Sequence, residues 1–327
     1  MQNITLISLG GTISSVENKQ TGKLESGKLT GNELIKDIDL ENFDLNLKIV
    51  DLKAIPSTEM KLSDIVDIKK QIDSEVEEGA DAIVLTHGTD TLEETAFMLD
   101  LLYNGKAPVV ITGSQRSMGN LGYDGSANLR DAIIVSSSDL SRNKGVLVVF
   151  DEKIFLARYV SKINSTELGG FSSTVSGPIG NVYGREVFYY YDTIEYKKLE
   201  ILDYNFEKSV YIVKMNLDFD ENIFDKIIDK DCHGIIIEGF GVGSVTPAVQ
   251  DKVEKAIKLG IPVVLVTKCI QGGVRCVYGT KGTAVKLKEL GAILDYGYLS
   301  SNKARLKLIA MQNSAEKDKI KNKWNLY

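Results

Sequence analysis

The sequence predicts an α/β protein of two domains, a larger N-terminal domain built on a doubly wound, mostly parallel sheet and a smaller C-terminal α/β domain. Three observations support this prediction. The 327 residues are more than a single hydrophobic core usually holds. Strand-like and helix-like patterns alternate along the chain, and such alternation demands crossover connections between parallel strands. Between positions 188 and 208 the alternation fades into aromatic and charged residues, which we interpret as a linker joining domains 1–187 and 209–327.

The N-terminal half contains the more regular alternation. Positions 82–86 form a nearly continuous apolar run, which is typical of a strand buried in a parallel sheet. Apolar residues recur at helical spacing between 62 and 76, with Ser63 available as a cap near the start. The segment 91–103 opens with Glu93 and Glu94, acids that the dipole favours in the first turn of a helix. We expect further strands at 4–9, 48–52, 108–112 and 146–150, and a helix at 127–135.

The C-terminal half resumes the alternation. Strands are expected at 210–215, 234–238 and 261–266, and helices at 248–259, 281–290 and from 301 onward. The glycine-rich stretch from Gly239 to Ser244 follows the second of these strands and superficially resembles a phosphate-binding loop. Its spacing departs from GxGxxG and no Walker lysine follows, so the sequence predicts a tight strand-to-loop turn.

Composition narrows the class of protein. Hydrophobic residues make up 43% and charged residues 26%, as in ordinary globular proteins, and a net charge of −6 argues against nucleic acid or an anionic membrane as partner. No apolar run is long enough to span a membrane, and no signal peptide is apparent, so we expect a cytoplasmic location. Cys232, Cys269 and Cys276 lack metal or redox spacing, and we expect them to be reduced and mostly buried. With only His87 and His233 in the chain, a histidine-based metal site is improbable.

Two glycine-containing turns carry the chemistry. Gly10-Gly11-Thr12 ends the first expected strand, and His87-Gly88-Thr89-Asp90-Thr91 ends the strand at 82–86. Ligands of open α/β sheets bind at this edge, and glycine allows sharp turns and close approach to the backbone. Hydroxyls placed there are suited to acyl transfer, which needs a nucleophile, a base and N–H groups facing the oxyanion. No GxSxG motif is present, so a serine-hydrolase elbow is excluded.

A polar segment at 14–31 follows Thr12 without hydrophobic period. It is either a surface loop or a lid that closes over bound substrate, and its position beside Thr12 favours the lid.

The two turns resemble those of the bacterial L-asparaginases. Further landmarks occur in the family's order and cover essentially the whole chain, more loosely after about position 205: they are Glu93-Glu94-Thr95-Ala96, Gln115-Arg116, Asp124-Gly125-Ser126-Ala127-Asn128-Leu129, Gly145-Val146-Leu147-Val148-Val149, Val160-Ser161-Lys162 and Asn302-Lys303-Ala304-Arg305. The resemblance implies hydrolysis of L-asparagine to L-aspartate and ammonia without metal or cofactor. It also implies a homotetramer, a dimer of dimers, in which a partner's C-terminal domain completes each site.

The resemblance assigns roles to individual residues. It implies that Thr12 forms the acyl-enzyme, that Thr89 is the second catalytic hydroxyl and that Asp90 binds the substrate's α-amino group. Asp90 could otherwise be the N-cap of the helix that follows. Lys162 matches the family's catalytic lysine, and a lysine desolvated in a pocket can accept a proton from a neighbouring hydroxyl.

Substrate binding is implied for a second set of residues, Ser57, Thr58, Gly88 and Ser114, together with Asp90. Ser57 matches the serine that binds the substrate carboxylate. Thr58 stands where many members carry glutamine.

The chain also departs from the family. Residues 13–31 contain no tyrosine, whereas many members carry one in the lid as partner of the nucleophile. In many members a neighbouring subunit also supplies a glutamate, but the corresponding segment here, 278–283, has none that aligns. The identity of the base for Thr12 therefore stays open, with Tyr278 as one candidate. Ser244 is a candidate for contact with substrate across a subunit interface.

Three alternatives stay open. One is a glutaminase-asparaginase. A second is the glutaminase component of a tRNA-dependent amidotransferase, which shares the threonine motifs but usually has an extra N-terminal domain. The third is a non-catalytic amino-acid-binding protein on the same scaffold, although retention of Thr12, Thr89, Asp90 and Lys162 together argues against it.

Overall fold

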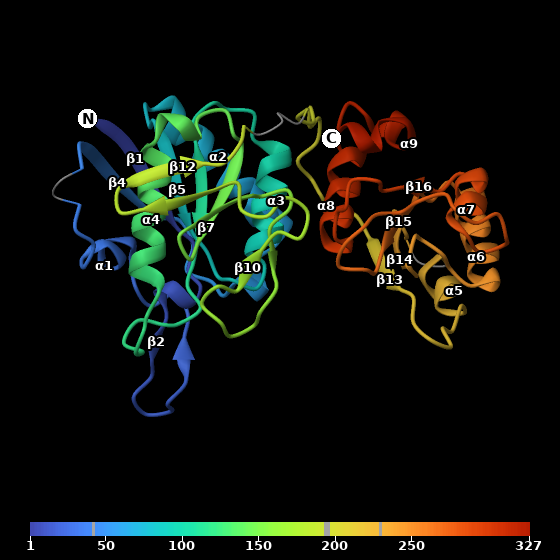
Figure 1. The fold of residues 1–327 in the computed structure, drawn as a ribbon, viewed down its shortest axis with the longest axis horizontal. Helices are drawn as coiled ribbons and strands as arrows, with labels where there is room; N and C mark the ends of the chain where they lie inside the picture. Colours follow the sequence, from blue (N-terminus) through green and yellow to red (C-terminus); the bar gives the residue numbers. More distant parts are fainter. Residues whose placement is uncertain (41–42, 193–196, 229–230) are drawn as a thin grey trace. The chain divides into compact units, whose positions relative to one another are not determined.

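The computed structural model describes residues 1–40, 43–192, 197–228 and 231–327. The chain divides into two compact units, residues 1–195 and 196–327, each an α/β sandwich around its own sheet (Figure 1). The predicted fold class is confirmed. The predicted linker, 188–208, begins within a strand of the first unit, at 186–189, and includes 193–196, which lie outside the described residues. Its limits stay a prediction.

The sheet of the first unit has the strand order β12-β11-β8-β7-β6-β5-β1-β4. Its strands are β1 (Gln2–Ser8), β4 (Leu45–Asp51), β5 (Ala82–Thr86), β6 (Val109–Thr112), β7 (Val146–Phe150), β8 (Lys153–Leu156), β11 (Gly180–Tyr183) and β12 (Glu186–Tyr189). The strands from β4 to β7 are parallel, and β8, β11 and β12 pair antiparallel. The chain leaves β1 for β4 on one side and returns to β5 on the other, so the topological switch point lies between β1 and β5.

Helices cover this sheet as the apolar patterns predict. They are α1 (Gly31–Ile35), α2 (Leu62–Glu77), α3 (Leu92–Leu102) and α4 (Gly125–Ser137), with 3₁₀ turns η1 (Thr12–Ser14), η2 (Ser57–Glu59) and η3 (Asp139–Ser141). Alternate strand residues such as Ile4, Leu6 and Val84 pack in one core cluster with residues of α1 and α4. The prediction that Ser63 caps α2 is wrong, because Ser63 lies inside the helix. The cap position is Lys61, whose N–H donates to the Asp64 carboxylate (2.7 Å).

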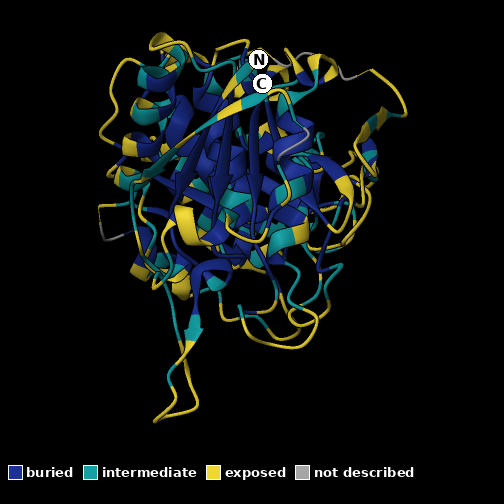
Figure 2. Cartoon of the chain, turned by 90° about the vertical axis from the view of Figure 1, so that its left-hand side faces the viewer, coloured by how far each residue is buried: buried dark blue, intermediate teal, exposed yellow. Residues whose placement is uncertain are grey.

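The polar segment at 14–31 forms a hairpin instead of an irregular loop. Its strands β2 (Val16–Glu17) and β3 (Leu24–Glu25) pair antiparallel, and Asn18 closes the turn by accepting from the Gln20 and Thr21 N–H groups. Figures 1 and 2 show the hairpin projecting from the first unit, with an exposed tip. Its base returns to the sheet where the Lys28 N–H donates to the Ser14 carbonyl (2.9 Å).

The second unit holds a parallel sheet in the order β13-β14-β15-β16. Its elements are β13 (Val210–Lys214), α5 (Ile223–Ile228), β14 (Gly234–Gly239), α6 (Pro247–Lys258), β15 (Val263–Thr267), α7 (Ala284–Leu290), β16 (Ile293–Leu294), α8 (Ser301–Gln312), η4 (Lys317–Lys319), α9 (Ile320–Lys323) and η5 (Trp324–Leu326). Thr246 caps α6, since its hydroxyl accepts from the Val249 N–H. The predicted tight turn after β14 is confirmed by the Phe240 N–H, which donates to the Ser244 carbonyl (2.7 Å).

The expectation that the cysteines are mostly buried is wrong. All three are free thiols, but Cys232 is only half-buried and Cys269 and Cys276 are exposed. The two exposed residues lie in the loop after β15, outside the sheet that forms the core. Within the described ranges, none of the helices has the length and apolarity that crossing a membrane requires.

Candidate active site

The two glycine turns predicted from the sequence touch each other at the switch point. Gly10 (φ 99°) and Gly11 (φ 87°) adopt a backbone conformation that side chains disfavour. A Cβ on Gly11 would lie 2.3 Å from the Gly88 Cα, and one on Gly10 would lie 2.5 Å from the Ile55 carbonyl oxygen. Glycine at position 11 lets the ends of β1 and β5 approach so closely, and this approach brings Thr12 and Thr89 to the same edge. Glycine at position 10 likewise lets the segment after β4 approach at Ile55.

Thr12 begins η1 and is half-exposed. Among the residues that the structure describes, its hydroxyl has no hydrogen-bond partner. The turn around it is held by its neighbours, because the hydroxyls of Ser14 (3.1 Å) and Ser15 (2.9 Å) both donate to the Gly11 carbonyl. The geometry therefore presents a fixed backbone with a hydroxyl left free to react.

Lys162 joins the second hydroxyl to a carboxylate. Its Nζ donates to Thr89 Oγ1 (2.9 Å) and forms an ion pair with Asp90 Oδ1 (2.7 Å). The Lys162 side chain is 16% exposed and that of Asp90 is 61% exposed, so the amine is sheltered while the carboxylate faces outward. Lys162 lies on β9 (Ser161–Lys162), which pairs with β10 (Phe171–Ser172), and its N–H donates to Glu93 Oε1 (3.3 Å).

Asp90 is not the N-cap of the following helix. The cap position of α3 is Thr91, whose hydroxyl donates to the Ser57 carbonyl (2.7 Å) instead of capping the helix. The described partner of the Asp90 carboxylate is Lys162. The geometry therefore does not support Asp90 as a helix cap. It places the Asp90 carboxylate beside Lys162 and Thr89.

The predicted substrate-binding residues differ in how they are placed. Ser57 is buried, and a Cβ on Gly88 would lie 2.8 Å from its hydroxyl oxygen, so Ser57 lies directly beside the second turn. Thr58 is exposed, and its side chain makes no hydrogen bond to Thr89, Asp90 or Lys162 among the described residues. Ser114 is fully buried, and its hydroxyl donates to the Arg116 carbonyl (2.7 Å). The structure brings Ser57 and Gly88 together and ties the Ser114 hydroxyl into its own loop.

His87 is fully buried beneath the second turn, and its Nδ1 lies 2.7 Å from the Gly88 carbonyl oxygen. Burial lowers the pKa of His87 to about 4, so the ring is neutral at pH 7. Since a carbonyl only accepts hydrogen bonds, Nδ1 carries the proton and donates it to Gly88. This bond fixes the peptide between Gly88 and Thr89.

Unpaired backbone N–H groups lie in the two glycine turns. Within the part of the chain that the structure describes, the backbone N–H groups of Thr12 and Thr89 have no acceptor. Unpaired N–H groups at the ends of parallel strands are suited to an anionic oxygen. Together with the free hydroxyl and the sheltered lysine, they provide the parts that acyl transfer requires.

Two residues that position the first turn were missed by the sequence analysis. The Gly11 N–H donates to Ser26 Oγ (3.1 Å), and the Tyr123 hydroxyl donates to the Ile13 carbonyl (3.0 Å). Ser26 belongs to the polar segment that was interpreted only as a loop or lid. Tyr123 immediately precedes the predicted landmark at Asp124, and this adjacency was the available signal.

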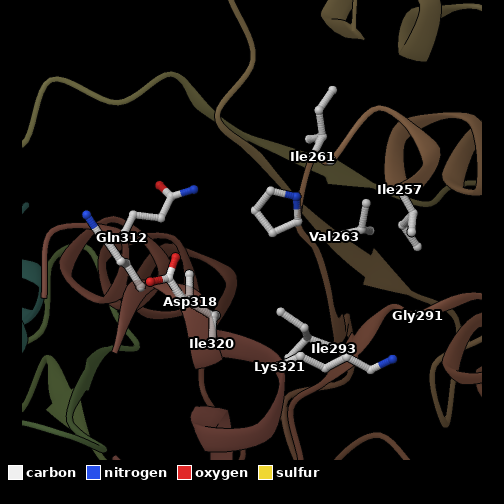
Figure 3. Close-up of a pocket in the computed structure, with 12 residues that line it drawn as sticks. Ile257, Ile261, Val263, Gly291, Ile293, Gln312, Asp318, Ile320 and Lys321 are labelled. Atoms are coloured by element: carbon white, nitrogen blue, oxygen red, sulfur yellow. The ribbon is translucent and has the colours of Figure 1, made fainter. Parts of the chain in front are cut away.

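Other regions have fewer groups that could take part in a reaction. No group of three His, Cys, Asp or Glu residues among those described could hold a metal ion. A cavity of about 410 Å³ in the second unit has an apolar floor, with Val263 and Ile293, and a polar rim with Asp318 and Lys321 (Figure 3). Both floor residues begin strands, so the cavity lies at the amino ends of β15 and β16, opposite the edge where α/β sheets bind ligands. None of its lining residues carries a hydroxyl or a thiol.

Two predicted contributors lie in the second unit. Tyr278 is 60% exposed, and its carbonyl accepts from the Thr283 hydroxyl (2.8 Å). Ser244 is half-buried in the turn after β14. Their roles at an active site stay predictions.

Comparisons with known proteins identify the family of the chain. Residues 3–195 match the family "Asparaginase, N-terminal", and residues 209–323 match "Glutaminase/Asparaginase C-terminal domain". The chain is 34% identical over 324 residues to an L-asparaginase of Bacillus licheniformis, covering 99% of both proteins. A crystal structure of a probable cytoplasmic L-asparaginase from Campylobacter jejuni matches with a TM-score of 0.87 and 27% identity, covering 100% of both chains. One component of a glutamyl-tRNA(Gln) amidotransferase from Methanobrevibacter smithii is 32% identical over 292 residues, covering 85% of this chain and 66% of that protein. The chain belongs to the asparaginase family, as its threonine motifs predict.

Proposed function

We propose that this protein is an L-asparaginase, which hydrolyses the side-chain amide of L-asparagine to give L-aspartate and ammonia. The observation that carries the proposal is the Lys162 amine, held 2.9 Å from Thr89 Oγ1 and 2.7 Å from Asp90 Oδ1 at the switch point beside the Thr12 turn. The full-length similarity to an enzyme named L-asparaginase supports the choice of substrate.

In the first half of the proposed reaction, the Thr12 hydroxyl attacks the amide carbon. The Thr12 Oγ–C bond forms, and the backbone N–H groups of Thr12 and Thr89 bind the resulting oxyanion. The C–N bond then breaks, the proton from Thr12 leaves with the nitrogen as ammonia, and an ester on Thr12 remains. The proposed reaction uses no metal or cofactor.

In the second half, water attacks the ester. We assign activation of that water to Thr89, whose hydroxyl proton passes to the Lys162 amine. Asp90 stabilises the ammonium that forms, because its carboxylate lies within ion-pair distance. The ester C–O bond breaks, the proton returns to Thr12, and L-aspartate leaves.

Recognition of the substrate is assigned to groups beside the second turn. Ser57, buried against Gly88, binds the α-carboxylate, and the outward-facing Asp90 carboxylate binds the α-amino group. We retain Thr58 and Ser114 as lesser contacts. Thr58 is the more accessible of the two, since it is exposed beside Ser57.

Hydrolysis of L-glutamine within an amidotransferase is the second candidate function. The similarity to the Methanobrevibacter smithii protein favours it, although the chain covers only 66% of that protein. We also propose a homotetrameric assembly, which sedimentation of the purified protein tests. The name of the Campylobacter jejuni neighbour supports a cytoplasmic location, to be checked by cell fractionation.

Ammonia release from purified protein tests the proposed function. L-asparagine, D-asparagine and L-glutamine are compared in parallel, with Thr89→Val as the control for contaminating activity. We expect L-asparagine to be the preferred substrate and the variant to be inactive. Release of ammonia only from L-glutamine would favour the amidotransferase function, and no release from any substrate would favour a non-catalytic protein.

A further inference from the structure

The Tyr123 hydroxyl connects two distant segments at the active site. It donates to the Ile13 carbonyl (3.0 Å), one residue after the proposed nucleophile and 110 positions away in sequence. The Tyr123 ring is half-buried and packs against the core cluster that includes Ile13 and Leu129. The hydroxyl therefore reaches the nucleophile turn from a side chain that the core already holds.

The loop that carries Tyr123 is itself firmly held. The Asp124 carboxylate accepts from the backbone N–H groups of Gln115 and Arg116, both at 2.9 Å. The Arg116 guanidinium donates to the Leu121 carbonyl (2.9 Å), and Asn128 Nδ2 donates to Asp124 Oδ2 (3.0 Å). These bonds fix both ends of the loop, so the position of the Tyr123 ring is set independently of the Thr12 turn.

Tyr123 acts as a hydrogen-bond donor and not as a base. Burial, and secondarily the Asp124 charge, raises the pKa of the Tyr123 hydroxyl, so it keeps its proton at neutral pH. That proton is directed at the Ile13 carbonyl. Tyr123 therefore does not replace the missing lid tyrosine as a proton acceptor.

Few other hydrogen bonds from outside the turn hold the backbone around Thr12. The Ser14 carbonyl accepts from the Lys28 and Leu29 N–H groups, at 2.9 and 3.0 Å, and both donors belong to the base of the hairpin. Gly11 is likewise held by Ser26 of the same segment. Bonds within the turn also hold residues 11–14. Among the described residues outside the turn, the Tyr123 hydroxyl is the hydrogen-bond partner of residues 11–14 that does not belong to the hairpin segment.

We propose that Tyr123 is a positioning residue, which holds the Ile13 carbonyl and thereby sets where the Thr12 hydroxyl lies relative to the substrate amide. The proposal rests on the proposed function of Thr12. Loss of the bond lets the turn shift, and small misplacements of a reacting group cost up to about 100-fold in rate. Because Ser57 and Asp90 bind the substrate separately, the loss falls on kcat and not on KM.

Tyr123→Phe tests the proposal because it removes only the hydroxyl. The matched control is Tyr103→Phe, which removes a hydroxyl that donates to the Ala107 carbonyl (3.1 Å) at the far end of α3. We expect Tyr123→Phe to lower kcat for L-asparagine about 10-fold with KM within about 2-fold of wild type. We expect Tyr103→Phe to leave both constants essentially unchanged. Assays are run at a temperature where circular dichroism shows both variants folded.

Two outcomes would overturn the positioning role. One is a kcat for Tyr123→Phe that equals that of Tyr103→Phe. The other is a raised KM with an unchanged kcat, which would place the hydroxyl in substrate binding. Failure of the proposed function itself is distinguishable, since then the wild-type protein releases no ammonia from L-asparagine and the comparison of variants never arises.

Discussion

The carboxyl edges of the two parallel sheets differ in what their polar groups bind. At the edge of the first unit, Lys162 joins Thr89 to Asp90 while the Thr12 hydroxyl has no partner among the described residues. At the edge of the second unit, the polar groups bind one another. The turn after β14 closes on itself, and the Thr267 hydroxyl donates to the Gly241 carbonyl (2.6 Å).

Each edge also has a lysine paired with a carboxylate. Lys162 is 16% exposed, whereas Lys214, which pairs with Glu238 at 3.1 Å, is 67% exposed. An exposed amine is solvated, while a sheltered amine can take part in proton transfer. The two sheets share an architecture but differ in which polar groups their local turns leave unpaired, and we propose that this difference places the reaction at the first edge.

The largest predicted effect is the loss of either hydroxyl at the first edge. We expect Thr12→Ala and Thr89→Val each to lower kcat by about 10³–10⁶-fold while leaving the fold intact, since both side chains lie at strand ends. The measurement is ammonia release under saturating L-asparagine, with circular dichroism to check folding.

Thr112→Val is the matched control for this pair. Thr112 ends β6, the strand beside β5, and its buried hydroxyl donates to the Val149 carbonyl (2.7 Å). We expect this variant to stay active. A variant of Thr12 or Thr89 that kept more than about a tenth of the wild-type rate would remove that residue from the mechanism.

Replacing the lysines tests the comparison of the two edges directly. Lys162→Met should abolish activity, because it removes the proposed acceptor for the Thr89 proton. Lys214→Met should leave kcat within about 2-fold, because the Lys214 amine is largely exposed to solvent. Equal losses in the two variants would contradict the distinction drawn here.

The same preparation tests for metal dependence. We expect wild-type activity to persist after dialysis against a strong chelator. Activity that is lost on dialysis and returns with a divalent cation would count against the proposed metal-free reaction.

The buried histidine of the first unit is expected to make folding sensitive to acid. The pKa of buried His87 is about 4 in the folded protein against 6.5 for an ordinary histidine, so below pH 6.5 the unfolded chain binds more protons. Folding stability therefore falls as the pH drops from 6.5 to 4, by on the order of 3 kcal/mol from this residue. His233, in the second unit, is 29% exposed and accepts from the Ser209 N–H (3.2 Å).

Urea unfolding of two variants at neutral pH and at a pH just above 4 separates these contributions. His87→Gln should reduce the loss of unfolding free energy between the two pH values, and His233→Gln, which replaces the histidine of the second unit, is measured beside it for comparison. The carboxylates titrate similarly in both variants, so the difference isolates the buried ring. If both variants matched the wild type, neutral burial of His87 would not explain acid sensitivity.

The sequence contains enough information to predict the fold class, the principal strands and the order of the threonine motifs. Buried parallel strands such as 82–86 have a strong apolar signature, and glycine followed by threonine marks where they end. The contact of Gly11 with Gly88 follows from two neighbouring strands that share one edge.

Other features depend on tertiary contacts that local patterns do not encode. The bond from Tyr123 to Ile13 joins residues 110 positions apart, and no periodicity marks it. The two strands of the hairpin within 14–31 have only two residues each, which is too short for the alternation that identifies a strand. The exposure of Cys269 and Cys276 contradicts the usual burial of cysteine, because the loop that carries them lies outside the core.

The smallest predicted effect concerns substrate choice at the first edge: kcat/KM for L-asparagine should exceed that for L-glutamine by at least about 10-fold, or roughly 1.4 kcal/mol. Ser57 and Asp90 fix the α-groups in the proposed complex, so side-chain length decides where the amide carbon lies relative to Thr12. One extra methylene moves that carbon by about 1 Å or more, and rates fall steeply with such misplacement.

We expect Thr58 to act in the opposite direction, since a side chain shorter than glutamine leaves more room for a longer substrate. Thr58→Gln should therefore raise the preference for L-asparagine if this space matters, and Thr58→Ser serves as the control that preserves it. Parallel kcat/KM measurements on both amino acids decide the question. Equal values for the wild-type protein would mean that the pocket accepts either chain length. The protein would then be a glutaminase-asparaginase, and the groups beside Thr12 would not select between the two substrates.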